Sequence, residues 1–491
     1  MRGDEKNLPN AGGGADPAAA LAGEIDATLA LPGMIDEARF ARFLDAQRDL
    51  GLTHGTRPLC RYLDPVLLSE EMYAALARGT AEIADALESV AARALVDPEM
   101  ADRLGLTADE QALAAIDPGY PQTLALGRFD ILLGENPRRF QLIELNADSP
   151  AGLADQLLLE KTLMTLPHLR AAFGRREVRT PAPHLAILRV LRQVYAAWGG
   201  RVRLPAIALV DWDGCDTAAE LRVLAEIFAA AGHPVHIADP GALRYDGRGL
   251  TVRSQPIDLV YRRVIVQELL ARGGLHHPLI RAYRDGAVCV ANSFRTKSLN
   301  KKAAFAVLSD PAFADLFTPA QRAAIAAHVP WTRRVGPGQT AWGDHAGVRS
   351  VELLELLRAR REDFVLKPND EYGGKGVMLG WKTSPGDWQR ALARWADAPL
   401  IAQARVPAAM IRMPTFDRSA PGGIAHEEVA FDLCPFIFAG RMEGAMVRLS
   451  SGPLSNVSAG GGVTALLIVG AGDGFAATAR AAPPAPEPSD V

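Results

Sequence analysis

A strand–helix–strand pattern between residues 206 and 290 constrains the fold of this chain most. Residues 206–210 are continuously apolar, as is typical of a strand buried on both faces of a parallel sheet. Residues 217–231 place apolar side chains on one face of a predicted helix, which Gly232 ends. Because strand–helix–strand connections form right-handed crossovers, the pattern predicts a Rossmann-like parallel α/β domain over residues 191–293. Its further strands are expected at 235–238, 259–261 and 288–290.

The predicted parallel domain lacks the signature of a dinucleotide site. No G-x-G-x-x-G follows its first strand. A Rossmann-type transferase that uses residues 206–292 stays open as an alternative function, and the missing glycines count against it.

Composition limits the class of protein. The 491 residues suffice for roughly two to four domains, and 48% hydrophobic with 22% charged residues is typical of a globular chain. A net charge of −4 without a basic run predicts no nucleic-acid partner. No apolar run approaches the roughly 20 residues of a membrane span, and no secretory signal begins the chain. The scattered cysteines lack zinc or C-x-x-C spacing, so we expect a cytoplasmic protein with reduced thiols.

The rest of the chain divides by composition and periodicity. Residues 1–30 and 476–491 are rich in Gly, Ala and Pro, and we expect both to be disordered tails. Apolar residues at helical spacing predict a helical region over 31–118, with a first helix at about 35–50. Residues 331–350 carry Gly and Pro and are predicted to form a loop.

Residues 127–152 predict a β-hairpin with a polar face and a turn at 134–138. Glu144 and Asn146 are two positions apart, so both side chains leave the same face of the sheet. Asp130 reaches that face from the paired strand. Two carboxylates and one amide oxygen fit a Mg²⁺ ion that also holds nucleotide phosphates. An edge hairpin whose polar face is merely solvated is the alternative.

A second polar stretch, residues 369–376, follows a predicted strand at 364–368. Its glycines predict a flexible flap whose backbone N–H groups close over phosphates; the residues concerned are Gly373, Gly374, Lys375 and Gly376. The stretch is not a P-loop, because neither Ser nor Thr follows the Gly-Lys pair and no helix begins there. A plain glycine-bearing turn is the alternative.

Several single polar residues gain meaning beside the flap. Lys367 ends a buried strand and needs an anionic partner, because an unpaired buried ammonium group is costly. Lys302, or its neighbour Lys301, offers a second positive charge to the same phosphates. Gln403 ends a strand and suits a hinge that hydrogen-bonds an adenine edge, although polar residues end many strands. Arg448 suits the charge that develops in phosphoryl transfer; a surface arginine is the alternative.

Together these motifs carry a family resemblance. Arg128-Phe-Asp130, followed by Glu144-Leu-Asn146-Ala-Asp-Ser-Pro, resembles the metal-binding signature of glutathionylspermidine synthetase and related permuted ATP-grasp ligases. The motifs Asn-Lys-Lys-Ala-Ala-Phe-Ala-Val-Leu and Val-Leu-Lys-Pro, together with the flap, resemble that family's nucleotide-binding elements. In ordinary ATP-grasp enzymes the Glu-x-Asn pair follows the flap. Here it comes roughly two hundred residues earlier, the order expected of a circular permutation. The resemblance covers roughly residues 120–465.

The resemblance implies a fold and a reaction. The expected fold is α/β (α+β), a permuted ATP-grasp fold with the Rossmann-like domain and the helical N-terminal region. Residues 119–190 would form its metal-binding part and 294–475 its lobes with the flap. Such enzymes transfer the γ-phosphoryl group of ATP to a carboxylate, and an amine then attacks the acylphosphate. The implied substrates are a small-molecule or peptide carboxylate and an amine.

The resemblance also implies residue roles. It assigns Mg²⁺ to Asp130, Glu144 and Asn146, phosphates to Lys302 and Lys367, the exclusion of water to the flap at 370–376, the adenine slot to Gln403 and Val406, and stabilisation of the reacting group to Arg128 and Arg448. A non-catalytic nucleotide-binding protein on the same fold is the second alternative to a ligase.

Overall fold

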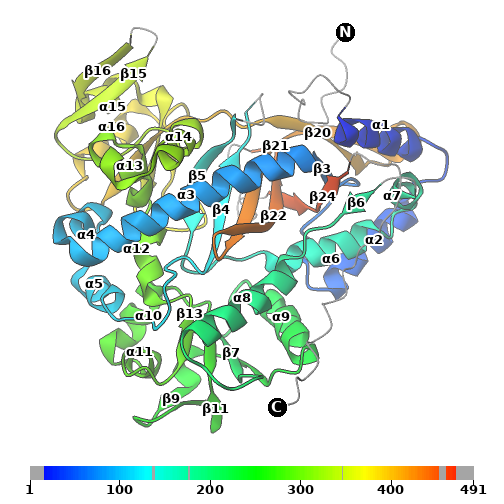
Figure 1. Cartoon of the computed structure of the whole chain (residues 1–491). Coiled ribbons are helices and arrows are strands. Elements are labelled where there is room, and N and C mark those ends of the chain that lie inside the picture. Colours follow the sequence, from blue (N-terminus) through cyan, green and yellow to red (C-terminus); the bar gives the residue numbers. More distant parts are fainter. Residues whose placement is uncertain (1–15, 135–138, 175–176, 345–346, 453–460, 471–491) are drawn as a thin grey trace.

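The computed structural model describes residues 16–134, 139–174, 177–344, 347–452 and 461–470. Most of the predicted turn at 134–138, the first 15 residues and the predicted tail at 476–491 lie outside these ranges. Helices surround several sheets, and strands from distant parts of the sequence lie side by side at the centre (Figure 1).

The central sheet joins an early hairpin to late strands. Its order is β23-β22-β21-β4-β5, with β20 paired to β21, and every pairing is antiparallel. The predicted hairpin is confirmed as β4 (Leu126–Leu132) and β5 (Gln141–Asn146). The late strands are β20 (Met410–Phe416), β21 (Ile424–Phe438), β22 (Arg441–Ser450) and β23 (Gly462–Thr464). Because β21 pairs with β4, the polar face of the hairpin adjoins side chains from the other end of the chain.

Long helices cover this sheet. Helix α3 (Glu70–Val96) begins after Ser69, whose hydroxyl accepts a hydrogen bond from the backbone N–H of Met72. Its apolar stripe, including Leu76 and Ile83, is fully buried, and the helix crosses β21 and β22 (Figure 1). Helices α6 (Leu153–Leu163) and α8 (Pro183–Ala197) also pack on the central sheet, α6 against β22 and α8 against both β21 and β22.

The predicted parallel sheet is confirmed. Its sheet has the order β13-β12-β7-β8 and all pairings are parallel. The strands are β7 (Ile207–Val210), β8 (Val235–Ala238), β12 (Leu259–Arg262) and β13 (Cys289–Ala291). Helix α9 (Ala218–Ala230) connects β7 to β8, and α10 (Val266–Gly273) and α11 (Pro278–Arg284) follow β12. The sequence did not predict a small antiparallel sheet of β9 (Leu243–Tyr245), β10 (Leu250–Val252) and β11 (Gln255–Ile257).

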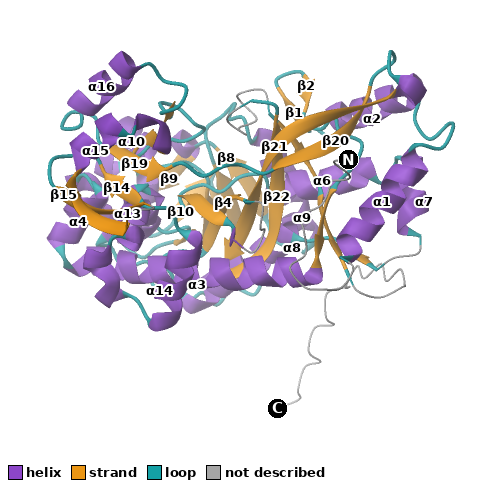
Figure 2. Cartoon of the chain, turned by 90° about the horizontal axis from the view of Figure 1, so that it is seen from above, coloured by secondary structure: helices purple, strands orange, loops and turns teal. Residues whose placement is uncertain are grey.

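A third sheet carries the glycine flap. Its order is β14-β19-β17-β18, formed by β14 (Thr332–Arg334), β17 (Phe364–Pro368), β18 (Met378–Leu379) and β19 (Leu400–Ala404). Helices α15 (Leu353–Ala359) and α16 (Pro385–Ala393) cover it, with Trp388 fully buried. The helical segment before it comprises α12 (Lys297–Asn300), α13 (Ala303–Ser309) and α14 (Pro319–His328). Figure 2 places this lobe at the opposite end of the molecule from α1 (Pro17–Leu29) and α7 (Pro167–Phe173).

Two predictions from composition were wrong. Residues 331–350 are not a loop, because β14 and the hairpin of β15 (Gln339–Asp344) and β16 (Gly347–Glu352) occupy them. Disorder was expected up to residue 30, yet α1 forms. Leu21, Ile25 and Leu29 recur at helical spacing and are buried, and the Asp16 carboxylate accepts from the backbone N–H of Ala18. A few apolar residues at the right spacing outweigh an alanine-rich composition.

The remaining elements complete the helical region and the periphery. They are α2 (Glu37–Asp49), α4 (Pro98–Leu104), α5 (Ala108–Ala114), β1 (Thr53–His54), β2 (Arg57–Pro58), and a sheet of β3 (Val66–Ser69), β24 (Leu466–Val469) and β6 (Val178–Arg179). Within the described ranges, no helix has both the length and the apolar character that a membrane crossing requires.

Candidate active site

The hairpin places four of the predicted residues on one face. In the register of β4 and β5, Asp130 lies opposite Glu144 and Arg128 lies opposite Asn146. The amide nitrogen of Asn146 donates to Asp130 Oδ1 at 3.3 Å. Alternation along each strand therefore produces the predicted polar face.

Asp130 is held by two arginines. Arg448 Nη2 donates to its Oδ2 at 2.9 Å, and Arg128 Nε donates to its Oδ1 at 3.2 Å. Burial raises the pKa of Asp130, but the two guanidinium groups outweigh burial and lower it to about 2. The carboxylate therefore stays ionised, and both of its oxygens already accept hydrogen bonds.

Sequence reasoning missed the second partner of Arg448. Asp432, on β21, accepts from Arg448 Nε at 2.8 Å and from Nη2 at 2.6 Å, and it is 1% exposed. The flanking carboxylates of Asp130 and Asp432 raise the pKa of Arg448 well above its ordinary value, against the effect of burial. A carboxylate on a predicted strand beside a candidate arginine was the available signal, and alternation alone does not pair residues from different strands.

Lys302 faces the hairpin. Its Nζ lies 3.0 Å from Glu144 Oε1 and also donates to the backbone carbonyl of Glu371 in the flap. The neighbouring Lys301 points elsewhere, to Glu110 and Asp370. The geometry thus distinguishes the two lysines that the sequence left open, and Lys302 is the one at the site.

Lys367 reaches the same hairpin from the third sheet. Its Nζ donates to the carbonyl of Ile143 at 3.0 Å and to Gln403 Oε1 at 2.8 Å. Burial lowers its pKa to about 8; Glu144 counteracts this effect, and the charge of Lys302 adds to it. Strands β5 and β17, far apart in the sequence, therefore meet through this ammonium group.

The residues predicted for the adenine slot are Gln403 and Val406. The side-chain amide nitrogen of Gln403 donates to Thr332 Oγ1 at 3.1 Å, and its oxygen accepts from Lys367. It orients Lys367 in this structure. Val406 lies half-buried in the segment after β19. The adenine contact of both residues stays a prediction.

The flap is a strand–loop–strand segment, as the sequence predicted. Strands β17 and β18 pair antiparallel, and the loop between them contains three glycines with positive φ: Gly373 (65°), Gly374 (76°) and Gly376 (70°). A Cβ at residue 376 would lie 2.7 Å from Pro368 Cγ, so the turn requires glycine there. Lys375 is exposed, with its Nζ 4.2 Å from the centre of the Tyr372 ring.

The face offers oxygen ligands for a divalent cation. Among the described residues, no donor bonds the amide oxygen of Asn146 or the second carboxylate oxygen of Glu144, whose side chain is 22% exposed. These two oxygens fit Mg²⁺ when phosphate oxygens and water complete its coordination. Within the described ranges, no group of three or more His, Cys, Asp or Glu side chains is arranged to hold a metal ion. Metal binding by Asp130, Glu144 and Asn146 stays a prediction.

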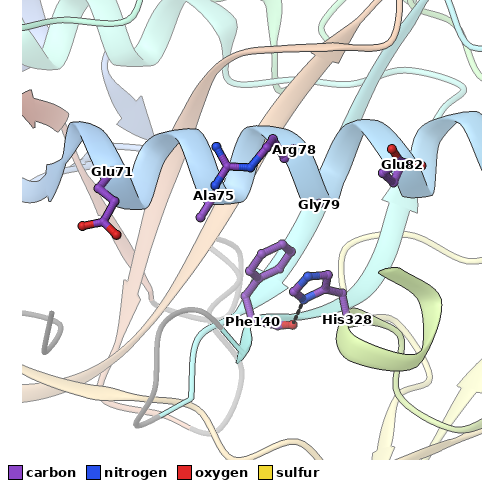
Figure 3. A pocket seen from close by; sticks show the side chains of 7 residues that line it. All are labelled: Glu71, Ala75, Arg78, Gly79, Glu82, Phe140 and His328. Atoms are coloured by element: carbon purple, nitrogen blue, oxygen red, sulfur yellow. Dashed lines mark hydrogen bonds between the residues drawn. The ribbon is translucent and has the colours of Figure 1, made fainter. Parts of the chain in front are cut away.

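A separate cavity of about 340 Å³ lies beside α3 (Figure 3). The rings of Phe140 and His328 stack at 3.8 Å beneath Gly79, and the ring nitrogen Nδ1 of His328 lies 3.1 Å from the Phe140 carbonyl oxygen. None of the predicted site residues lines this cavity, so it is not the proposed active site. Residues 453–460, which follow β22, lie outside the described residues.

Comparison with known proteins indicates the fold. No family model matches the sequence, and no curated protein does. Among solved structures, a glutathione synthetase-like effector from Globodera pallida, in its apo form, matches with a TM-score of 0.52 and 11% identity, over 89% of this chain and 99% of that chain. The chain thus has a mixed α/β fold similar to that of a glutathione synthetase-like protein.

Two more distant structures also match. One is named for a gamma-glutamylcysteine synthetase from Methylobacillus flagellatus, with a TM-score of 0.40 and 10% identity over 75% of this chain and 83% of that chain. The other is a RimK domain ATP-grasp protein from Sphaerobacter thermophilus, with a TM-score of 0.24 and 16% identity over 53% of this chain and 90% of that chain. At these scores neither structure supports a statement about the site or the reaction.

Proposed function

We propose that this chain is an ATP- and Mg²⁺-dependent ligase that joins a carboxylate to an amine through an acylphosphate. The observation that carries the proposal is the convergence of two lysines on one polar face beneath a glycine flap. Lys302 pairs with Glu144 at 3.0 Å, and Lys367 reaches the adjoining carbonyl of Ile143 at 3.0 Å. Cations from two separate segments that meet at a carboxylate–amide face suit a triphosphate and its metal ion.

Each residue of the proposed site has its own role in phosphoryl transfer. Lys302 and Lys367 hold the phosphates, and the flap over residues 370–376 excludes water that would hydrolyse the acylphosphate. Glu144 and Asn146 would hold Mg²⁺, which supplies charge neutralisation on the phosphates. A carboxylate oxygen of the substrate attacks the γ-phosphorus and ADP leaves. The amine nitrogen then attacks the acyl carbon, phosphate leaves and the amine loses a proton.

In this proposal Arg128 and Arg448 stabilise the negative charge that develops during phosphoryl transfer. Asp130 orients both guanidinium groups; Arg128 Nη1 also donates to the Ala151 carbonyl at 2.8 Å, and Arg448 also donates to Asp432. We assign Asp130 to holding these arginines first, because its oxygens already accept three donors, those of Arg128, Asn146 and Arg448. Metal binding by Asp130 is the second role that we assign to this carboxylate.

The chain order supports a permuted arrangement. The hairpin β4–β5 precedes the flap in the sequence, yet it pairs with β21 in the central sheet. Strands β21 and β22 follow the flap and bring Arg448 to the same face. The permuted order of the elements and the choice of substrates are part of what we propose.

A second candidate is a nucleotide-binding protein without catalysis. One observation favours it: Asp130 is engaged by arginines and Glu144 by Lys302, so two of the three predicted metal ligands already have cationic partners. Binding of a nucleotide without turnover is the expected behaviour of such a protein.

The test is ADP release from ATP and Mg²⁺ in the presence of mixed amino-acid and peptide carboxylates and amines. The parent chain should release ADP, and Glu144→Ala should lower the rate at least about a hundredfold. Glu99→Ala, at an exposed helix position paired with Arg103, is the matched control and should retain the parent rate. Equal turnover by Glu144→Ala and the parent would contradict the site assignment. Nucleotide binding with no ADP under any mixture would favour the second candidate.

A further inference from the structure

A cluster of four charged side chains, three of them buried, lies at the start of the flap. The carboxylate of Asp370 lies 2.5 Å from Lys297 Nζ and 2.6 Å from Lys301 Nζ. Glu110 faces the same two lysines, at 2.9 Å from Lys301 and 3.6 Å from Lys297. The lysine side chains are 1% and 3% exposed, and that of Asp370 is 26% exposed. We name Glu110, Lys297, Lys301 and Asp370 the flap anchor.

Three members of the flap anchor lie in or directly after helices: Glu110 in α5, Lys297 in α12 and Lys301 at the end of α12. Glu110 closes the capping box of α5, where its Oε2 accepts from the backbone N–H of Thr107 at 2.9 Å. Lys297 also donates to Gln267 Oε1 on α10 at 3.3 Å. Asp370 is therefore the one contribution of the flap. Its two ion pairs tie the flap to Lys297 and Lys301 at α12, and Glu110 links the same lysines to α5.

The residues on both sides of Asp370 contact the segment that carries Lys302. The carbonyl of Asn369 accepts from the backbone N–H of Lys302 at 3.0 Å, and its side-chain oxygen accepts from that of Ala303 at 2.9 Å. The carbonyl of Glu371 accepts from Lys302 Nζ. Lys302 is thus held by the two residues that flank Asp370, Asn369 and Glu371.

The flap beyond Asp370 is held far less. Tyr372 is exposed, and its hydroxyl donates to Glu268 Oε1 at 3.3 Å. The turn itself has local backbone bonds of 3.3 Å, from residue 375 to 372 and from 377 to 374, and within the described ranges no longer-range backbone bond to it is seen. By contrast, the N–H of Asn369 donates to the Pro399 carbonyl at 3.0 Å beside the strand pair β17–β19.

We propose that Asp370 is a positioning residue, which fixes the base of the flap and Lys302 while the tip at residues 372–377 moves over the nucleotide. The inference rests on the proposed nucleotide site. Charge supports the assignment, because Lys297 and Lys301 are neutralised by Asp370 and Glu110. Lys302 and Lys367 are then the lysines that we assign to the phosphates, since Lys297 and Lys301 already have carboxylate partners.

Hydrogen exchange of the ligand-free protein tests the anchor without any assay of activity. Amides of residues 372–377 should exchange fast and that of Asn369 slowly. Asp370→Asn should speed exchange at Asn369 at least about tenfold, since it leaves the buried lysines with one carboxylate. Asp370→Glu should restore protection in part. Asp387→Asn, an exposed carboxylate on α16 in the same lobe, is the control and should leave exchange unchanged.

Kinetics gives the second readout. Asp370→Asn should raise the KM for ATP at least about fivefold and change kcat by no more than about twofold, because the displaced Lys302 binds phosphate less well. If Asp370→Asn does not fold, the charge-balanced pair Lys297→Gln and Asp370→Asn takes its place with the same expectation. Parent-like protection at Asn369 in the variant would overturn the anchor, whether or not the chain turns over ATP. Absence of ATP turnover in the parent would overturn the ligase and leave the exchange result standing.

Discussion

Arg448 Nη2 donates to Asp130 Oδ2 at 2.9 Å although the two residues are 318 positions apart in the chain. The same nitrogen of Arg448 also donates to Asp432 Oδ2, at 2.6 Å. One buried arginine thus joins β22, β21 and β4 across the face that we propose as the active site. Breaking this contact should affect both stability and the site.

Stability at acid pH should depend on Asp130. Arg448 and Arg128 outweigh burial and lower its pKa from 3.8 to about 2. Because the folded-state pKa lies below the unfolded one, the stabilisation is complete above about pH 4 and is lost as the pH falls towards 2. We expect a contribution on the order of 2 kcal/mol to the free energy of unfolding. Urea titrations of the parent and Asp130→Asn at pH 6 and pH 3 measure it. Equal pH dependence in both proteins would contradict the prediction.

Binding of ATP should weaken in alkaline solution because of Lys367. Burial lowers its pKa to about 8, so the ammonium group that faces the phosphates loses its proton as the pH rises from 7 to 9. The KM for ATP should rise over this interval in the parent. Lys367→Arg keeps its charge and should show no such rise. In the free protein the sign is opposite for stability, which should increase from about pH 8 upward as the unfolded chain binds more protons. A flat KM profile in the parent would argue against a phosphate contact by Lys367.

Glu220 should hold the parallel domain to the central sheet. Its carboxylate accepts from the backbone N–H groups of Gly152 and Leu153 at 3.1 and 2.9 Å, and it lies 3.4 Å from Arg263. Glu220→Ala should lower the free energy of unfolding by about 3 kcal/mol, because it removes the carboxylate beside buried Arg263 and the acceptor of two N–H groups. Glu226→Ala, at an exposed position of the same helix, is the control and should change it by less than about 0.5 kcal/mol. Equal effects of the two variants, measured by urea unfolding, would refute the assignment.

Two helical glycines should respond in opposite directions to alanine. In α3, a Cβ at Gly79 would lie 2.6 Å from Phe140 Cζ and 3.1 Å from the His328 ring, so Gly79→Ala should destabilise the protein by about 1–3 kcal/mol. In α1, Gly23 has no atom within 4 Å of an added Cβ, and Gly23→Ala should stabilise it by up to about 1 kcal/mol. Melting temperatures compare the pair directly. If Gly79→Ala raised the melting temperature, the rings of Phe140 and His328 would have to move aside without loss of stability, which would contradict the prediction.

The predictable part of the fold was the part with strong periodicity. Continuous apolar runs gave the parallel sheet, and alternation gave the hairpin with Glu144 and Asn146 on one face. Composition was a poor guide at the chain's beginning, where three leucine and isoleucine side chains of α1 are buried. The hairpin β15–β16 was missed because its exposed strand, β16, has no apolar alternation to signal it.

The candidate site was predictable by residue type and not by pairing. Asp130, Lys302 and Lys367 were each named from local motifs, and the structure places them around one hairpin. Partners such as Asp432 and Asp370 come from strands and loops whose contacts depend on tertiary packing. Local sequence contains no information on which buried carboxylate meets which cation, so ion pairs across 318 residues were out of reach.

The pairing of β4 with β21 has a consequence for synthesis on the ribosome. Strand β4 is translated long before β21, and at about 5–20 residues per second the delay is roughly 15 to 60 seconds. During this time one edge of the early hairpin has no strand beside it, and unpaired edges attract other chains. Nascent chains of this protein should therefore depend on chaperones that shield the edge until β21 emerges. Slowing translation should increase aggregation.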